Sequence, residues 1–153
     1  MALRLGVGLP PVAAVGASAV ILATALAAPV AQATLGYPSG EPFYESLFPI
    51  CHQYPGRSIW ILGQPCGLCA RCLGGYAGAV LLSVLHFAGV LRRMDTTLFL
   101  LLGTSLVVLG VGDAIFKFAT GIDGSNAWRF GTGLLGGLGF AMVLAFPWKR
   151  TVA

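Results

Sequence analysis

Hydrophobic residues occupy long uninterrupted stretches of this chain, and the charged residues lie mostly between them. Four stretches have the length of a membrane-spanning helix, at residues 11–33, 73–91, 96–118 and 127–148. Each contains roughly 20 residues, which at a rise of about 1.5 Å per residue crosses the ~30 Å hydrocarbon layer of a bilayer. None of them alternates with a period of two, so the strands of a transmembrane barrel are not indicated. The pattern predicts an all-α membrane protein with about four transmembrane helices.

The segment 35–68, between the first two stretches, has a different composition. It contains five prolines and six aromatic residues. Prolines interrupt regular structure, and aromatic rings favour the boundary between membrane and water. We therefore expect an irregular extramembrane cap here, with one short helix near residues 43–48. The chain 1–153 is then a single membrane domain.

The composition narrows the class of protein. Of the 153 residues, 57% are hydrophobic and 9% are charged, whereas about 25% charged residues are typical of a soluble domain. A surface so poor in charge requires membrane lipids as its surroundings. The net charge of +4 does not indicate nucleic-acid binding, because no basic stripe interleaved with aromatic residues is present.

The basic residues between the stretches predict the orientation in the membrane. With four crossings, five of them lie on one side together with a single acid, Asp95: Arg4, Arg92, Arg93, Lys149 and Arg150. Such an excess is typical of cytoplasmic loops. We expect a protein of the cytoplasmic (inner) membrane, with both termini in the cytoplasm and the cap extracytoplasmic. A signal peptide cleaved near residues 31–33 is the alternative; a retained helix is favoured because the apolar run is long.

All four cysteines fall within 22 residues, at Cys51, Cys66, Cys69 and Cys72, and His52 follows the first of them. Cys69 and Cys72 are spaced to bind one ion from a turn that enters a helix. Cys51 with either His52 or Cys66 would complete four ligands for zinc. The amino end of the helix also favours thiolate over thiol. We favour a structural zinc site.

Other cysteine chemistry stays open for an extracytoplasmic cap. An oxidising compartment favours disulfides, and the pairs Cys69–Cys72 and Cys51–Cys66 are stereochemically feasible. Redox-active thiols and an iron–sulfur cluster are further alternatives. Haem attachment is not indicated, because it requires a histidine after the second cysteine of the motif and Leu73 follows Cys72.

A second group of polar residues is predicted to meet on the side of the cap. Asp113 lies inside an apolar stretch, where a carboxylate is costly without a partner. We expect it to pair with Lys117 at i+4 or with Arg129. The other members of this polar cluster are Asn126, Arg57 and Arg71. A salt-bridged cluster that fixes helix packing is the simplest interpretation, and a role in holding a proton or a substrate is the alternative.

Glycines at a spacing of four residues predict close helix packing in two of the stretches. The pairs are Gly74 with Gly78, and Gly133 with Gly137. Small residues at this spacing let two membrane helices approach until their backbones touch. We expect these helices to pack tightly within the chain or against another subunit.

Several of these motifs together resemble a family of small predicted integral membrane proteins of unknown function. The resemblance covers roughly residues 48–140. Its motifs are Cys51-His52-Gln53, Arg57-Ser58, Cys69-Ala70-Arg71-Cys72 and Asn126-x-x-Arg129-x-x-Thr132-Gly133, with Asp113 inside a helix. The resemblance implies a multi-helix membrane fold with a shared polar site, and it implies no activity. Cys66 and the Ala-rich first stretch are not part of this pattern.

The sequence contains no complete catalytic constellation, so no catalytic residue is assigned and an enzyme is not favoured. The small size, the sparse polar site and the glycine-lined helix faces favour an accessory or structural subunit of a larger membrane complex, such as an energy-transducing or photosynthetic one. One alternative is a small enzyme or carrier for a lipid-soluble substrate such as a quinone. Another is a thiol–disulfide or metal-handling protein. No motif specifies a bound lipid or pigment.

Overall fold

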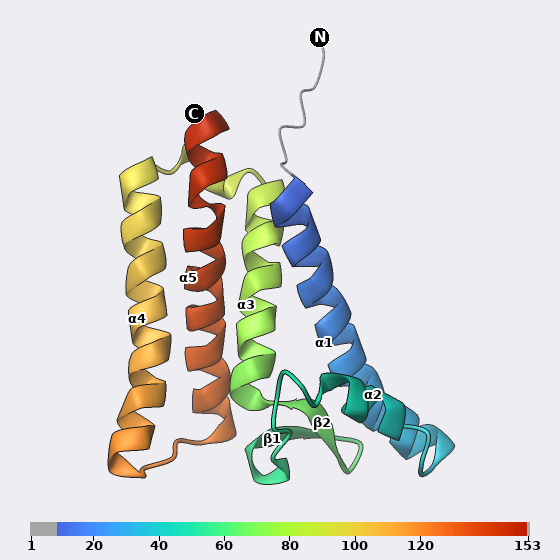
Figure 1. Cartoon of the computed structure of the whole chain (residues 1–153). Coiled ribbons are helices and arrows are strands. Elements are labelled where there is room, and N and C mark those ends of the chain that lie inside the picture. The colour runs from blue at the N-terminus through green and yellow to red at the C-terminus, as the bar shows by residue number, and fades with distance from the viewer. Residues whose placement is uncertain (1–8, 153) are drawn as a thin grey trace.

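Four long helices make up most of the protein in the computed structural model, which describes residues 9–152 and the side chains of 15–91 and 94–145 (Figure 1). The helices are α1 (Leu9–Leu35), α3 (Ala70–Phe87), α4 (Thr96–Thr120) and α5 (Asn126–Val152). By length and apolar composition, each is able to cross a membrane. The prediction of an all-α membrane protein with about four such helices is confirmed.

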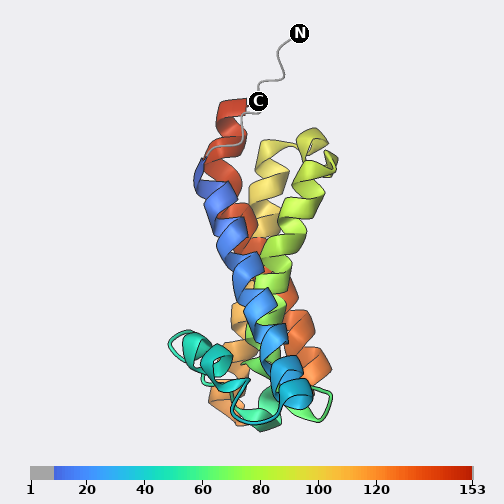
Figure 2. The ribbon, with the colours of Figure 1, turned by 90° about the vertical axis from the view of Figure 1, so that its right-hand side faces the viewer.

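The long helices lie in the order α4, α5, α3, α1 (Figure 1). Helix α5 packs against both α3 and α4, and α1 packs against α3. Figure 2 shows α1 crossing in front of this group at a slant. Helices α3 and α4 follow each other in sequence but are not neighbours in this order, because α5 lies between them.

The cap with its cysteines lies at one end of the four long helices. Helix α3 begins there, and the connection from α4 to α5 lies at the same end, whereas α1 begins and α5 ends at the other (Figure 1). The orientation in the membrane stays a prediction. The prediction was based on five basic residues. Arg4 lies outside the described residues, and the structure does not describe the side chains of Arg92, Arg93, Lys149 and Arg150.

Glycines allow α3 and α5 to touch backbone to backbone. A Cβ atom on Gly74 would lie 2.2 Å from the carbonyl oxygen of Phe130, and one on Gly78 would lie 2.2 Å from that of Leu134. From the other side, a Cβ on Gly133 would lie 2.2 Å from the oxygen of Arg71, and Gly137 approaches Gly75 as closely. No other side chain fits at these positions, and the crossing holds the start of α5 against the start of α3.

The cap contains more regular structure than the sequence indicated. Helix α2 spans Glu41–Leu47, and an antiparallel hairpin joins β1 (Ser58–Ile61) to β2 (Gln64–Cys69). Short 3₁₀ turns lie at Pro55–Arg57 and Val90–Arg93. The short helix expected near residues 43–48 is therefore present, and the hairpin is an addition that the sequence did not indicate. The hairpin turn is Leu62-Gly63, with φ of 52° and 76°, and leucine is not a residue that signals a turn of this kind.

One buried apolar cluster lies where the cap meets α1 and α3, and a second, with Phe99 and Met142, lies among the long helices. The buried members of the first cluster come from the cap, α1 and α3: Ala25, Leu47, Cys51, Cys66, Leu68 and Leu73. Tyr76 and Phe130 pack against this cluster from the long helices. The cap is therefore attached to the helices by a continuous apolar contact, in which Cys51 and Cys66 are buried and against which Cys69 and Cys72 pack.

Candidate metal centre and polar network

Three cysteines from separate parts of the chain meet where the cap joins α3. Cys51 follows α2, Cys69 is the last residue of β2 and precedes α3, and Cys72 lies in the first turn of α3. Their Sγ atoms all lie within 4.8 Å of one another. The backbone N–H of Cys69 donates a hydrogen bond to Cys51 Sγ at 3.3 Å. The hairpin produces this arrangement, because it returns the chain from Cys51 to the start of α3.

The cluster fits a soft metal ion. With Zn–S bonds near 2.3 Å, tetrahedral geometry places two sulfur atoms about 3.8 Å apart, so the observed sulfur positions require only a small contraction. Cys51 is buried, whereas Cys69 and Cys72 are half-buried. The three thiols therefore form a set that could hold a metal ion at the edge of the apolar core.

The other two predicted ligands do not belong to this group. Cys66 is buried, and its thiol donates a hydrogen bond to the carbonyl oxygen of Ala25 on α1 at 3.3 Å. Burial raises the pKa of the Cys66 thiol. His52 is exposed and is not among the gathered ligands. All four cysteines are free thiols, so neither of the disulfides considered as alternatives is formed.

The surroundings of the three sulfurs favour negative charge on Cys51. Hydrogen bonds from the side chains of Cys69 and then Cys72 hold the pKa of the Cys51 thiol far below its ordinary value. The amino end of α3 adds a favourable field, because its first N–H groups have no partner within the helix. A thiolate held in this way is the form that binds metal.

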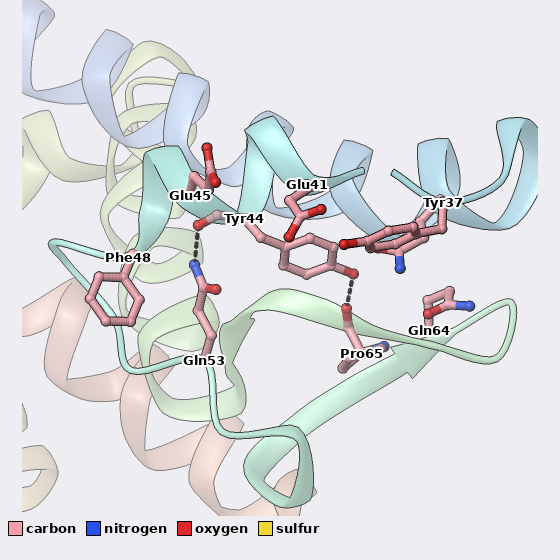
Figure 3. Close-up of a pocket in the computed structure, with 9 residues that line it drawn as sticks. Tyr37, Glu41, Tyr44, Glu45, Phe48, Gln53, Gln64 and Pro65 are labelled. Atoms are coloured by element: carbon pink, nitrogen blue, oxygen red, sulfur yellow. Dashed lines mark hydrogen bonds between the residues drawn. The ribbon is translucent and has the colours of Figure 1, made fainter. Parts of the chain in front are cut away.

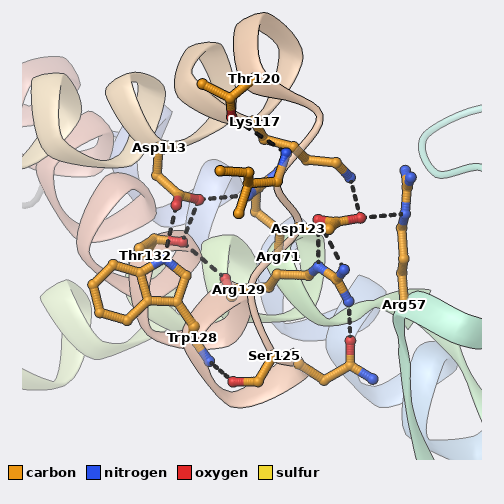
Figure 4. A network of polar contacts seen from close by, with 12 residues as sticks. Arg57, Arg71, Asp113, Lys117, Thr120, Asp123, Ser125, Trp128, Arg129 and Thr132 are labelled. Carbon is orange, nitrogen blue, oxygen red and sulfur yellow. Dashed lines mark hydrogen bonds and ion pairs between the residues drawn. The ribbon is translucent and has the colours of Figure 1, made fainter.

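A carboxylate inside the helices connects this site to α4 and α5. Arg71, between Cys69 and Cys72, forms an ion pair with Asp113 on α4. Asp113 also accepts hydrogen bonds from Trp128 Nε1 at 2.7 Å and from Thr132 Oγ1 at 3.0 Å. Three helices therefore meet at one carboxylate (Figure 4). The guanidinium Nε of Arg71 is buried and has no hydrogen-bond partner among the described residues.

A second carboxylate, Asp123 in the connection from α4 to α5, gathers three cations. Arg129 approaches at 2.8 Å, Lys117 at 2.8 Å and Arg57 at 3.3 Å (Figure 4). The hydrogen bond from Lys117, followed by that from Arg129, lowers the pKa of Asp123 to about 2. The expected pairing of Asp113 with Lys117 or Arg129 was wrong, because both cations bind Asp123, which the loop places among them.

The start of α5 is fixed to the cap and to its own first turn. Asn126 Nδ2 donates to the carbonyl oxygen of Ser58 on β1 at 3.0 Å, and its side-chain oxygen accepts from Arg129. Ser125 caps the helix, because its hydroxyl accepts from the N–H of Trp128 at 3.2 Å. Sequence analysis missed Asp123, Trp128 and Thr132 as members of this network. The proximity of Asp123 to a cation at i+6 was the available signal.

Comparison with known proteins agrees with this architecture. Residues 51–143 match the DUF2085 family, which is described as a predicted membrane protein. The chain belongs to this family. The match begins at Cys51 and includes all three clustered cysteines, both carboxylates of the polar network and the crossing of α3 with α5. The resemblance noted in the sequence is thereby confirmed, and α1 and α2 lie outside the matched region.

Two archaeal relatives are similar to parts of the chain. An uncharacterized protein of Methanothermobacter thermautotrophicus is 31% identical over 94 residues, which are 61% of this chain and 83% of the relative. An uncharacterized protein of Methanocaldococcus jannaschii is 43% identical over 37 residues, 24% of each chain. No solved structure matches.

Proposed function

We propose that this membrane protein uses Cys51, Cys69 and Cys72 to bind a zinc ion that fixes the cap to the membrane helices. The observation that carries the proposal is the approach of the three Sγ atoms to within 4.8 Å. If all three cysteines were thiolates, as in a zinc site, the sulfur atoms at this separation would repel one another unless a cation lay between them. A cation would offset that repulsion and close the junction between the cap and α3.

The position of the cluster supports a structural role for the ion. The three cysteines join the segment after α2, the end of the hairpin and the first turn of α3. Apolar residues surround them, including Leu47 and Leu73. Structural zinc sites commonly join short irregular segments that have too little core of their own. The cap is such a segment, since its helix has seven residues and its strands have four and six.

We further propose that the protein is an accessory or structural subunit of a larger membrane complex. Its support is the apolar surface of α4, where Val108, Ile115 and Phe118 are among many exposed large side chains. Lipid alone would cover such a surface, and so would a neighbouring subunit. Gentle solubilisation followed by native gel electrophoresis tests this role. Migration with other subunits is expected, and migration of the native protein as an isolated chain would contradict it.

Metal analysis of the purified protein tests the zinc site. We expect about one zinc ion per chain, and its loss in Cys69→Ser and Cys72→Ser. The matched control is Cys66→Ala, which removes a buried thiol outside the cluster and should keep the ion. His52→Ala tests the fourth ligand. If the imidazole of His52 binds the ion, this variant should lose affinity for zinc.

Two results would reject the zinc proposal. The first is native protein that contains no metal, when thiol titration accounts for all four cysteines as free thiols or as two disulfides. The second is equal metal content in Cys69→Ser and the wild type. A fall in metal content for Cys66→Ala alone would place the ion elsewhere in the cap.

One observation favours a second candidate, a small membrane enzyme or carrier. The three thiolates leave a fourth position that no gathered side chain fills, and three protein ligands with an open position are typical of catalytic zinc. The nearby Arg71 also retains a buried donor, Nε, without a partner among the described residues. A substrate oxygen could use both. If this function is correct, Asp113→Asn and Arg129→Gln should abolish activity in folded protein, and unchanged activity in both would exclude it.

A further inference from the structure

An open pocket lies on the cap, between α2 and the start of the hairpin strand β2. Its volume is about 350 Å³, and it is bordered by the end of α1, by α2 and by the start of β2. The lining residues are Gln32, Tyr37, Glu41, Tyr44, Glu45, Phe48, Gln53, Gln64 and Pro65. Figure 3 shows Tyr37, Glu41 and Tyr44 side by side at one end of it, across from Gln64 and Pro65. Small-molecule pockets begin at about 300 Å³, so the volume suits a small group.

The lining of this pocket is unusual for the chain. Glu41 and Glu45 are its only glutamates, and Gln32, Gln53 and Gln64 are its only glutamines. All five therefore line one pocket, although they come from four separate segments. In a protein with 9% charged residues, this convergence concentrates carboxylate and carboxamide oxygens at a single place.

The charge in the pocket is not compensated within the described chain. No lysine or arginine lines it, and among the described side chains neither glutamate forms an ion pair. The two carboxylates lie four residues apart on α2, a spacing at which like charges repel. Elsewhere in the described chain, Asp113 and Asp123 are each paired with at least one cation. The pocket is therefore a site of negative potential on a protein whose net charge is +4.

Aromatic rings form the rest of the wall, and that of Tyr44 is held in place. Tyr44 donates a hydrogen bond to the carbonyl oxygen of Pro65 at 2.6 Å, and Gln53 Nε2 donates to the carbonyl oxygen of Tyr44. The first bond joins the Tyr44 ring to the hairpin and fixes its orientation, and the second joins the backbone of α2 to the segment that follows Cys51. The hydrogen bond with Glu41 and the charge of that carboxylate raise the pKa of Tyr37, whose ring is exposed.

A fixed ring beside a carboxylate binds one class of cation well. Quaternary and primary ammonium groups combine a positive charge with an apolar surface, and aromatic faces attract both features. A metal ion would instead need several carboxylates converging on one point, and here the carboxylates lie one turn apart. The pocket adjoins the end of the membrane span Val15–Leu35, which contains Gln32. It therefore lies near the level of lipid headgroups.

We propose that this pocket binds an ammonium group, with Glu41 supplying the opposite charge and Tyr37 and Tyr44 the aromatic contact. The ammonium belongs either to a lipid headgroup or to a free small amine. The carboxamides of the glutamines accept or donate hydrogen bonds to the rest of the headgroup. No cysteine lines this pocket, so its proposed ligand contacts none of the residues of the metal centre.

The glutamines make the test specific. In protein labelled with ¹⁵N on side-chain amides, the three glutamines all report from the pocket, and the only asparagine, Asn126, reports from outside it. Choline is titrated into protein in an uncharged detergent, and its uncharged carbon isostere is the control ligand. We expect choline to shift the glutamine signals and to leave Asn126 unmoved, and we expect the isostere to shift neither.

Variants separate charge from ring contact. Glu41→Gln removes one charge with little change of shape and should weaken choline binding about tenfold, as expected for loss of a charge-assisted contact. Tyr37→Leu removes an exposed ring without disturbing the core and should also weaken binding. The matched control is Asp95→Asn, which removes the same charge at the other end of the molecule and should leave affinity unchanged.

A second arm identifies the source of the ammonium group. Protein in nanodiscs of phosphatidylcholine is compared with protein in nanodiscs of phosphatidylglycerol. If the glutamine signals shift in phosphatidylcholine nanodiscs but not with free choline, the site binds a lipid headgroup. If they also shift with free choline, the site binds a soluble amine as well. No shift in either arm, equal shifts with the uncharged isostere, or full affinity in Glu41→Gln would overturn the proposal.

Discussion

Two glycines on α5 allow the helix crossing to be tested with a matched pair of substitutions. A Cβ on Gly133 would lie 2.2 Å from the carbonyl oxygen of Arg71, whereas one on Gly131 would meet no atom within 4 Å. Ordinary contacts of a Cβ begin near 3.4 Å, so Gly133→Ala must move α5 away from α3 by about 1.2 Å. Helices packed this closely cannot absorb such a shift locally, because the neighbouring glycines of the crossing would lose contact as well.

The expected cost follows from overpacking. Added atoms in a well-packed interior typically cost about 1–3 kcal/mol, and for a chain of this size each kcal/mol lowers the melting temperature by about 2–4 °C. Gly133→Ala should therefore melt roughly 2–12 °C below the wild type. Gly131→Ala gains helix propensity of up to about 1 kcal/mol and should melt at the same temperature or slightly higher.

Thermal unfolding of both variants in one detergent measures the difference, and circular dichroism at low temperature confirms equal helix content beforehand. Equal melting temperatures for the two alanine variants would refute the reasoning, because they would show that α3 and α5 do not touch at Gly133. A decrease in Gly131→Ala as large as that in Gly133→Ala would refute it too.

Two further predictions concern the carboxylates of the polar network. Asp113→Asn leaves the partly covered guanidinium of Arg71 without its ion pair and should destabilise the protein by about 1–3 kcal/mol, measured as a lowered melting temperature; an unchanged value would show that the pair contributes nothing to the fold. For Asp123, whose pKa is lowered to about 2, the ion pairs with Lys117 and Arg129 stabilise the protein fully above pH ~4, the ordinary pKa of an aspartate. That stabilisation should disappear as the pH falls from about 4 toward about 2, and the melting temperature of Asp123→Asn should lack this component of the pH dependence.

The sequence by itself determined the class of protein and the approximate position of its site. Long apolar stretches can only be helices in a bilayer, because an isolated segment must satisfy its own backbone hydrogen bonds there. The glycines at a spacing of four residues indicated close helix packing, because this spacing places them on one helix face. The gathering of four cysteines within 22 residues marked the candidate metal site before any contact was known.

Only the tertiary structure decided which groups meet. The Leu62-Gly63 turn creates a hairpin that brings Cys51 to Cys69 and directs Cys66 toward α1, so three thiols and not four share a centre. The connection from α4 to α5 places Asp123 among the cations and leaves Arg71 to pair with Asp113. Local spacing determines which side chains share a helix face, but contacts between segments depend on how loops return the chain. That return is set by the packing of the whole molecule.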